Sequence, residues 1–169
     1  MSLVLLLGGA RSGKSALAVR LAGDRATFLA TGTAEDDEMA ARIERHRAER
    51  PAGWATIEEP LALRSALESV DAAETVVVDC LSLWVSNLLG AGSTDDAVEE
   101  EAAAVARGAS ARDGVTVVVS NEVGLGIVPM NPLGRRYRDL LGTVNRLFAA
   151  EAERALLVVA GRGLELGRL

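Results

Sequence analysis

Short apolar runs alternate with amphipathic patterns of helical period along the 169 residues of the chain. This alternation is typical of the α/β class, in which helices flank a mostly parallel sheet. The runs predict strands at Leu3–Leu7, Ala26–Ala30, Ala55–Ile57, Thr75–Val78, Val115–Val119 and Ala155–Val159. Because no repeat, low-complexity tract or long linker interrupts the pattern, residues 1–169 are predicted to form a single domain.

The segments between the predicted strands carry the signals of helices. The clearest begins with Asn131 as its cap and Pro132 in its first turn, and apolar residues keep helical spacing after them. An acidic, alanine-rich helix that ends near Arg107, with Thr94 or Asp95 as its cap, is expected to lie outside, in solvent. Further helices are predicted at Ala16–Ala22, Asp36–Arg50, Leu61–Val70 and Leu81–Leu89.

The strongest functional signal is a phosphate-loop motif, G-x-x-x-x-G-K-S, directly after the first predicted strand. Its residues are Gly8, Gly9, Ala10, Arg11, Ser12, Gly13, Lys14 and Ser15. Between a strand and a helix, such glycines let backbone N–H groups surround phosphate oxygens, while Lys14 supplies a positive charge and Ser15 a ligand for Mg²⁺. The dipole of the helix that follows favours the same anion. The motif therefore predicts binding of a nucleoside triphosphate.

Asp79 ends the apolar strand that contains Val76, Val77 and Val78, as the acidic residue of a Walker B element does. Many strands end in aspartate, so the signal is weak alone, but beside a complete phosphate loop it indicates a second Mg²⁺ contact with Ser15. The neighbouring Cys80 is interpreted as a small buried hydrophobic residue.

His46 is the only histidine of the chain, and with Met39 and Ile43 it falls on one stripe of the predicted helix Asp36–Arg50. Helical spacing alone would equally suit a half-buried structural histidine. Four arginines on the same predicted helix favour a functional role for His46, because arginines around one imidazole suit a polyphosphate better than a protein core. These arginines are Arg42, Arg45, Arg47 and Arg50.

The segment Ser120–Pro129 places polar groups and two glycines after the strand Val115–Val119, at the end of a strand where α/β sheets bind ligands. An ordinary connecting loop is the alternative. The sequence also leaves open whether the charged residues of the following helix face solvent or reach the site; these are Arg135, Arg136, Arg138 and Asp139.

Composition excludes several classes of protein. The net charge of −6 argues against a nucleic-acid partner, because a phosphate backbone requires a basic face. The first apolar run is too short to span a membrane, and a single cysteine forms no intrachain disulfide, so a cytoplasmic protein without a membrane span is predicted. The guanine-reading element Asn-Lys-x-Asp of small GTPases and the motifs of protein kinases are absent from the sequence.

The order and spacing of the motifs resemble those of the bifunctional adenosylcobinamide kinase/adenosylcobinamide-phosphate guanylyltransferase family. The resemblance runs from about Leu3 to Ala160, whereas Gly161–Gly167 departs from the form expected for the family. The segments that carry it are Gly8–Ser15, Ala30–Thr33, Asp36–Ile43, His46 with Arg50 and Pro51, Val78–Leu89 and Ser120–Pro129.

The resemblance implies a RecA-like P-loop fold and two reactions. ATP or GTP phosphorylates the aminopropanol hydroxyl of adenosylcobinamide, and GMP from GTP is then transferred to that phosphate. It also implies that His46 becomes guanylylated and that the enzyme is a homo-oligomer, a trimer. Beyond the phosphate loop, the residues implied to contact the guanine nucleotide are Thr31, Gly32, Thr33, Arg47, Ala48, Glu49, Arg50, Glu58 and Asp79.

Two other functions fit the residues less well. One is a small-molecule P-loop kinase with a single activity, in which His46 is only structural. The other is a nucleotide-binding switch without chemistry on a second substrate. Neither function requires a lone imidazole among arginines. An imidazole that attacks phosphorus must be neutral, and like-charge repulsion from nearby arginines favours the neutral form of the imidazole.

Overall fold

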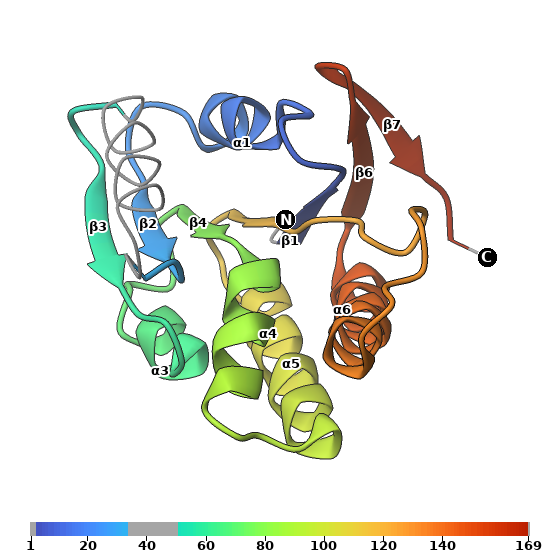
Figure 1. The fold of residues 1–169 in the computed structure, drawn as a ribbon. Helices are drawn as coiled ribbons and strands as arrows, with labels where there is room; N and C mark the ends of the chain where they lie inside the picture. Colours follow the sequence, from blue (N-terminus) through green and yellow to red (C-terminus); the bar gives the residue numbers. More distant parts are fainter. Residues whose placement is uncertain (1–2, 34–50, 169) are drawn as a thin grey trace.

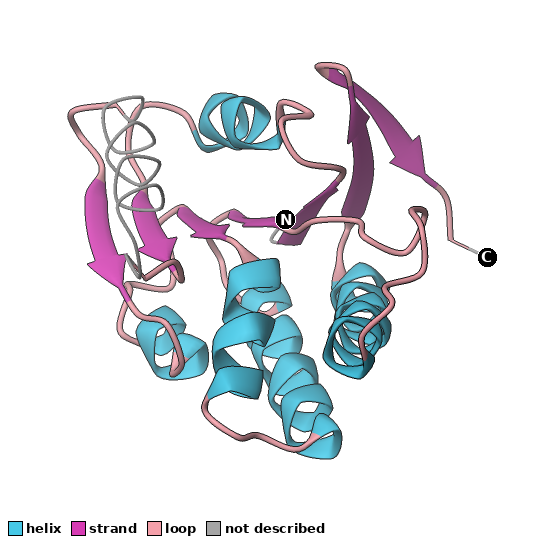
Figure 2. Cartoon of the chain, viewed as in Figure 1, coloured by secondary structure: helices cyan, strands magenta, loops and turns pink. Residues whose placement is uncertain are grey.

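The computed structural model describes residues 3–33 and 51–168, in which strands and helices alternate (Figure 1, Figure 2). The strands are β1 (Leu3–Leu7), β2 (Thr27–Ala30), β3 (Ala55–Glu58), β4 (Val76–Asp79), β5 (Thr116–Val119), β6 (Arg154–Val159) and β7 (Arg162–Leu166). The helices are α1 (Lys14–Ala22), α3 (Leu63–Glu68), α4 (Leu81–Gly90), α5 (Asp95–Ser110) and α6 (Pro132–Glu151). The helix predicted at Asp36–Arg50 lies outside the described residues.

The strands form a seven-stranded sheet in the order β3-β2-β4-β5-β1-β6-β7. Strands β1 to β6 run parallel, and β7 pairs with β6 in the antiparallel sense. Strand β5 lies between β1 and β4, so that Val119 pairs with both Leu6 and Asp79. The phosphate loop and Asp79 therefore follow strands that are separated by one neighbour. This is the RecA-like arrangement of a P-loop protein, and the predicted fold class is confirmed.

Helices cover both faces of the sheet (Figure 1). Helix α1 packs on one face, where Leu6, Val77 and Val117 are buried. Helices α3 to α6 cover the other face, which buries Leu5 and Val118 among others. Successive side chains of a strand point to opposite faces, so strands covered on both faces are apolar almost throughout. This is why the central strands read as continuous apolar runs in the sequence.

Two predicted helix caps are confirmed. The Thr94 hydroxyl accepts a hydrogen bond from the Ala97 N–H (3.3 Å), and the Asn131 side chain accepts one from the Gly134 N–H (2.6 Å). The expectation that α5 is a solvated outer helix is only half right. Its acidic face is exposed, but its opposite face is buried against α3 and α6 by Val98, Ala102, Val105, Ala106 and Ala109.

Candidate active site

Two glycines of the phosphate loop, Gly8 and Gly13, are required by packing as well as by ligand access. A Cβ at Gly8 would lie 2.3 Å from the carbonyl oxygen of Val158 in β6. Gly13, the residue before α1, has φ +102°, a left-handed conformation that residues with a side chain rarely adopt. A Cβ there would also lie 3.2 Å from the Cα of Gly161. The loop therefore fits closely against the strand and turn beside it.

Lys14 is buried, with only 7% of its surface exposed, and its ammonium group points back into the loop. Its Nζ donates hydrogen bonds to the carbonyl oxygens of Gly8 (2.9 Å) and Gly9 (2.7 Å), and lies 3.4 Å from the Ser12 hydroxyl. A buried ammonium group held by backbone carbonyls is a positive charge fixed within the loop, where it can attract phosphate oxygens.

Ser15 and Asp79 lie together, as the sequence predicts. The Ser15 hydroxyl donates a hydrogen bond to a carboxylate oxygen of Asp79 (3.2 Å), which joins the start of α1 to the end of β4. Two hard oxygen donors at this point suit Mg²⁺, which binds proteins through one or two carboxylates and completes its shell with phosphates and water. Among residues 3–33 and 51–168, no group of three or more His, Cys, Asp or Glu side chains is arranged to hold a metal.

The turn between β6 and β7 supports the phosphate loop, and the sequence interpretation did not include it. Ala160 (φ 50°) and Gly161 (φ 75°) are both left-handed, as in a two-residue hairpin turn. The Gly161 N–H donates a hydrogen bond to the carbonyl oxygen of Ser12 (2.8 Å). The alternating residues of β7 after a Gly-containing turn are the signal that could have predicted this hairpin.

Thr31 ties β2 to the end of β4. Its buried hydroxyl donates to the carbonyl oxygen of Cys80 (2.7 Å) and accepts from the Cys80 N–H (2.9 Å). The Asn87 amide donates to the carbonyl oxygens of Thr31 (2.7 Å) and Pro60 (3.1 Å). These bonds hold the ends of three neighbouring segments at one edge of the sheet. Gly32 and Thr33 follow on the same edge, and the nucleotide contacts assigned to all three residues stay predictions.

Cys80 is buried, in agreement with its interpretation as a small hydrophobic residue. Burial, and next the charge of Asp79, raise the pKa of its thiol to about 11. The thiolate, which is the reactive form, is therefore scarce at neutral pH. The structure gives Cys80 a packing role beside the site rather than a chemical one.

We expect Cys80 to react slowly with a thiol reagent such as dithionitrobenzoate in the native protein at pH 8. Denaturation in guanidinium chloride exposes the thiol and returns its pKa toward 9.0, so the reaction should become complete within the mixing time. Absorbance of the released thionitrobenzoate measures both rates. Equal rates in the two conditions would contradict the buried position of Cys80.

Glu58 is the last residue of the edge strand β3, and its side chain is exposed at the same edge of the sheet as Asp79 and the phosphate loop. Four strand-to-strand steps separate β3 from β1, which is roughly 19 Å at about 4.8 Å a step. This separation is comparable with the length of an extended nucleoside triphosphate. The contact of Glu58 with a guanine nucleotide stays a prediction.

The polar segment after β5 is tied to its neighbours. The Ser120 hydroxyl donates to the side-chain oxygen of Asn145 (2.6 Å), whose amide donates to the Asn121 carbonyl oxygen (3.1 Å). The Glu122 N–H donates to the carbonyl oxygen of Gly8 (3.1 Å). The segment therefore holds α6 and the phosphate loop together, and it joins the site at the edge where the sequence places it.

The charged residues at the start of α6 divide into two groups. Arg136 forms an ion pair with Asp95 (2.7 Å), and Arg135 donates to the carbonyl oxygens of Pro129 and Met130 (3.1 and 2.7 Å). These two arginines join α6 to the start of α5 and to the loop that precedes α6. Arg138 and Asp139 instead pair with each other (2.7 Å) on the wall of a cavity.

Five residues predicted to belong to the site lie outside the described residues. They are His46, Arg47, Ala48, Glu49 and Arg50. The remaining predicted residues follow β1, β2, β3 and β4 on one edge of the sheet. Their arrangement is that of a nucleotide site in a parallel α/β sheet.

Comparison with known proteins agrees with this geometry. Residues 4–166 match the family of cobinamide kinase / cobinamide phosphate guanyltransferase. The chain belongs to this family. The match includes the phosphate loop, Asp79 and the β6–β7 hairpin, and it extends over residues 161–166 of the tail that departs in sequence from the expected form.

Curated relatives cover nearly the whole chain. The bifunctional adenosylcobalamin biosynthesis protein CobP of Pseudomonas aeruginosa is 45% identical over 168 residues, which are 96% of this chain and 95% of that protein. The protein CobU of Salmonella typhimurium, with the same descriptive name, is 39% identical over 97% of this chain and 99% of its own length.

Among solved structures, a protein from Pyrococcus horikoshii superimposes with a TM-score of 0.57 at 10% identity, covering 97% of this chain and 85% of its own. At this identity the likeness concerns the fold alone. Within the described ranges, no helix is both long and apolar enough to cross a bilayer.

Proposed function

We propose that this protein phosphorylates adenosylcobinamide on its aminopropanol hydroxyl with ATP or GTP, and then transfers GMP from GTP onto the new phosphate. The products of the second step are adenosylcobinamide-GDP and pyrophosphate, and His46 carries GMP between donor and acceptor. One observation supports this most strongly. A complete phosphate loop, with Lys14 buried in it and Ser15 against Asp79, lies in a chain of the cobinamide kinase / cobinamide phosphate guanyltransferase family.

In the kinase step, the phosphate loop binds the donor triphosphate and Lys14 neutralises charge that develops on the transferred phosphoryl group. The acceptor hydroxyl oxygen forms a bond to the γ-phosphorus while the bond to the β-phosphate oxygen breaks, so that the nucleoside diphosphate leaves and the hydroxyl proton passes to water. Ser15 and Asp79 would hold Mg²⁺, which when bound neutralises the phosphate oxygens and orients them.

In the transfer step, a neutral imidazole nitrogen of His46 attacks the α-phosphorus of GTP, and pyrophosphate leaves as the P–O bond to the β-phosphate breaks. A phosphate oxygen of the acceptor then attacks the same phosphorus and breaks the P–N bond, which frees His46. A covalent intermediate divides one difficult displacement into two easier ones. The arginines near His46 in the sequence would stabilise the departing pyrophosphate.

Product analysis tests the two activities separately. The protein is incubated with adenosylcobinamide and Mg-ATP, then with Mg-GTP, and the corrinoids are identified by mass spectrometry after each stage. We expect the phosphate first and the GDP derivative second. A product series that stops at the phosphate would support the single-activity kinase, and unchanged adenosylcobinamide would support a nucleotide switch.

We propose that Glu58 reads the guanine base. Its carboxylate would accept hydrogen bonds from the N1–H and 2-amino groups of guanine, and adenine offers neither donor at that edge. Glu58→Gln should therefore reduce the preference for GTP over ATP in GMP transfer by about tenfold, the worth of a hydrogen bond to a charged group. The ratio of kcat/KM values for the two nucleotides measures this effect.

Glu59→Gln is the matched control for Glu58→Gln. The Glu59 carboxylate accepts from the N–H groups of Leu61 and Ala62 (2.9 and 2.8 Å), so its replacement perturbs the same segment without touching Glu58. We expect it to leave the nucleotide preference unchanged. Equal discrimination in wild type and Glu58→Gln would rule out the role of Glu58.

The homo-oligomeric state, a trimer by family resemblance, stays a prediction. The partners proposed for the site are ATP, GTP, adenosylcobinamide and its phosphate, with Mg²⁺ as cofactor.

A further inference from the structure

An open surface depression of about 600 Å³, called the cavity below, lies between α6 and the segment that follows β5. One wall is Gly124 of that segment, and the other is a face of α6. The lining residues on α6 are Arg138, Asp139, Gly142, Thr143 and Arg146. Gly124 belongs to the segment that joins the nucleotide site, whereas the five α6 residues are not among those predicted to bind the nucleotide.

The spacing of the lining residues explains the shape of this cavity. Arg138, Gly142 and Arg146 recur every four residues, so they lie on one side of α6. Gly142 has no side chain, and a Cβ built there meets no atom within 4 Å. An open space therefore separates the two guanidinium groups, with the hydroxyl of Thr143 beside it.

The charge of the cavity is positive within a protein of net charge −6. Two arginines and one aspartate line it, and Arg138 pairs with the carboxylate of Asp139 (2.7 Å). Arg146 makes no hydrogen bond or ion pair with any residue that the structure describes. An arginine in this position is suited to a phosphate group, which its planar guanidinium binds through two hydrogen bonds.

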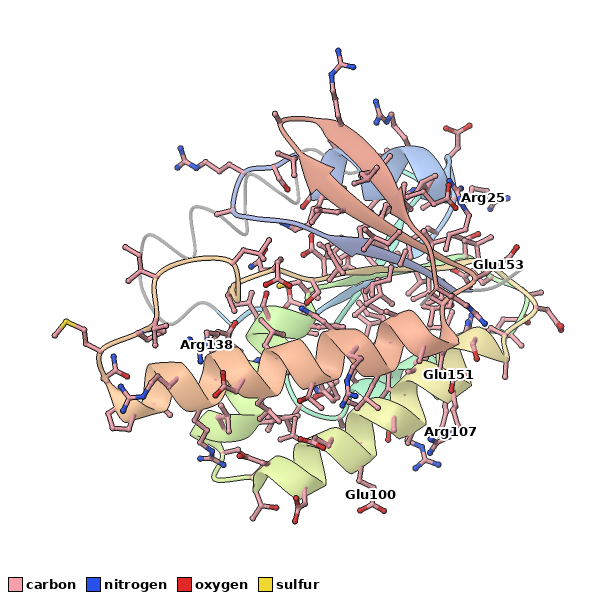
Figure 3. The ribbon with its side chains drawn as sticks, turned by 90° about the vertical axis from the view of Figure 1, so that its right-hand side faces the viewer. Arg25, Glu100, Arg107, Arg138, Glu151 and Glu153 are labelled. Carbon is pink, nitrogen blue, oxygen red and sulfur yellow. The ribbon has the colours of Figure 1, made fainter. Side chains whose placement is uncertain are left out.

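The Gly124 wall of the cavity lies close to the phosphate loop. Glu122 donates its N–H to the carbonyl oxygen of Gly8, and Gly124 follows two residues later, at most about 7 Å along the chain. The segment is further held to α6 through Asn145, the neighbour of Arg146. Arg138 lies toward the N-terminal end of α6, whereas Arg107 and Glu151 lie at the other end of the helical layer (Figure 3).

We propose that this cavity binds the phosphate group of the acceptor in GMP transfer, cobinamide phosphate, with Arg146 as its principal contact and Arg138 and Thr143 beside it. The inference rests on the proposed function and adds the residues that hold the second substrate. The triphosphate of the donor already has the phosphate loop and Lys14, so a separate cationic cavity beside that loop serves a second phosphate. Unphosphorylated cobinamide has no such group and gains nothing from Arg146.

The test compares Arg146→Gln with wild type and with a matched control. Arg107→Gln also removes one exposed arginine, but from α5, where Arg107 does not line the cavity. Steady-state KM values are measured for cobinamide phosphate and GTP in the transfer reaction, and for cobinamide in the kinase reaction. Thermal unfolding of each variant verifies that it is folded.

We expect Arg146→Gln to raise the KM for cobinamide phosphate about tenfold relative to the KM for cobinamide, as loss of a charge-assisted hydrogen bond does. Arg146→Lys should restore part of the affinity, and Arg107→Gln should behave as wild type. An unchanged ratio, or a rise in the KM for GTP, would overturn the assignment of this cavity. A wild-type protein that forms no cobinamide-GDP would instead refute the proposed function.

Discussion

Lys14→Ala is expected to abolish both the kinase and the GMP-transfer activity. One phosphate loop serves both donor nucleotides in the proposed mechanism, and Lys14 is the charge buried within it. Removal of a preorganised electrostatic contact of this kind lowers kcat by about 10²–10³. The two activities are assayed separately on the purified variant, with saturating ATP for the first and GTP for the second.

The structure gives a reason for both activities to fall together. The ammonium group of Lys14 lies between the carbonyl oxygens of Gly8 and Gly9. Alanine leaves these acceptors without their charged donor in a buried place, so the loop loses an organising contact as well as its charge. Arg20→Ala is the matched control, since it removes one exposed positive charge from the same helix, α1.

A chemical experiment tests Lys14 without substitution. Lys14 is the only lysine of the chain, so reductive modification by pyridoxal phosphate and borohydride can label only this side chain and the terminal amine. We expect Mg-GTP to protect Lys14 from modification, as shown by peptide mass analysis.

Near-normal rates for either activity in Lys14→Ala would demonstrate a second nucleotide site.

The sequence predicts β1 to β6 within one residue at either end and does not predict β7. The central strands are predictable because they are buried on both faces. A strand covered on both sides has apolar residues at nearly every position, which makes β1 and β4 visible without structural information. The caps Thr94 and Asn131 were equally visible, because helix N-termini select a few side chains that accept backbone hydrogen bonds.

The features that the sequence did not predict depend on tertiary packing. The apolar face of α5 consists mainly of alanine and valine, so its burial against α3 and α6 was masked by the acidic residues between them. The β6–β7 turn depends on two left-handed residues, of which Ala160 is not a glycine. Its contact with Ser12 joins residues far apart in the chain, and no local pattern records such a contact.

The residues of the candidate site also divide into those that a local motif predicts and those whose role depends on tertiary packing. Residues in a motif with a fixed local geometry, such as the phosphate loop and Asp79, were found at the expected ends of β1 and β4. The sequence left open whether the charged residues at the start of α6 face solvent or reach the site, and only their partners in the structure distinguish them. Arg136 pairs with Asp95, whereas Arg138 lines a cavity with Arg146, a difference that depends on how α6 packs against its neighbours.

His46 is expected to retain radioactivity from GTP labelled at the α-phosphate and none from GTP labelled at the γ-phosphate. The prediction rests on a lone histidine that the sequence pattern places on one stripe of a predicted helix with Met39 and Ile43, on the arginines near it in the sequence, and on membership of the family. The protein is mixed with Mg²⁺ and either labelled nucleotide, denatured, and counted after precipitation.

The chemical stability of the label identifies the bond. A phosphoramidate of histidine is labile to acid and stable to base, whereas phosphoserine and phosphothreonine survive acid and are lost in base. We therefore expect the α-label to disappear at low pH and to persist at high pH. Peptide mapping of the base-stable product should place GMP on the peptide that contains His46.

His46→Ala should lose the label and reduce GMP transfer on the order of 10³-fold or more, because the nucleophile that forms the covalent intermediate is gone. Kinase turnover should survive, since phosphoryl transfer depends on positioning of the donor by the phosphate loop rather than on an imidazole. This contrast separates His46 from Lys14, whose replacement lowers both activities. Retention of γ-label by the wild type, or of α-label by the alanine variant, would show that His46 is not the nucleophile. A structural histidine in a single-activity kinase would then account for the predicted helical stripe of Met39, Ile43 and His46.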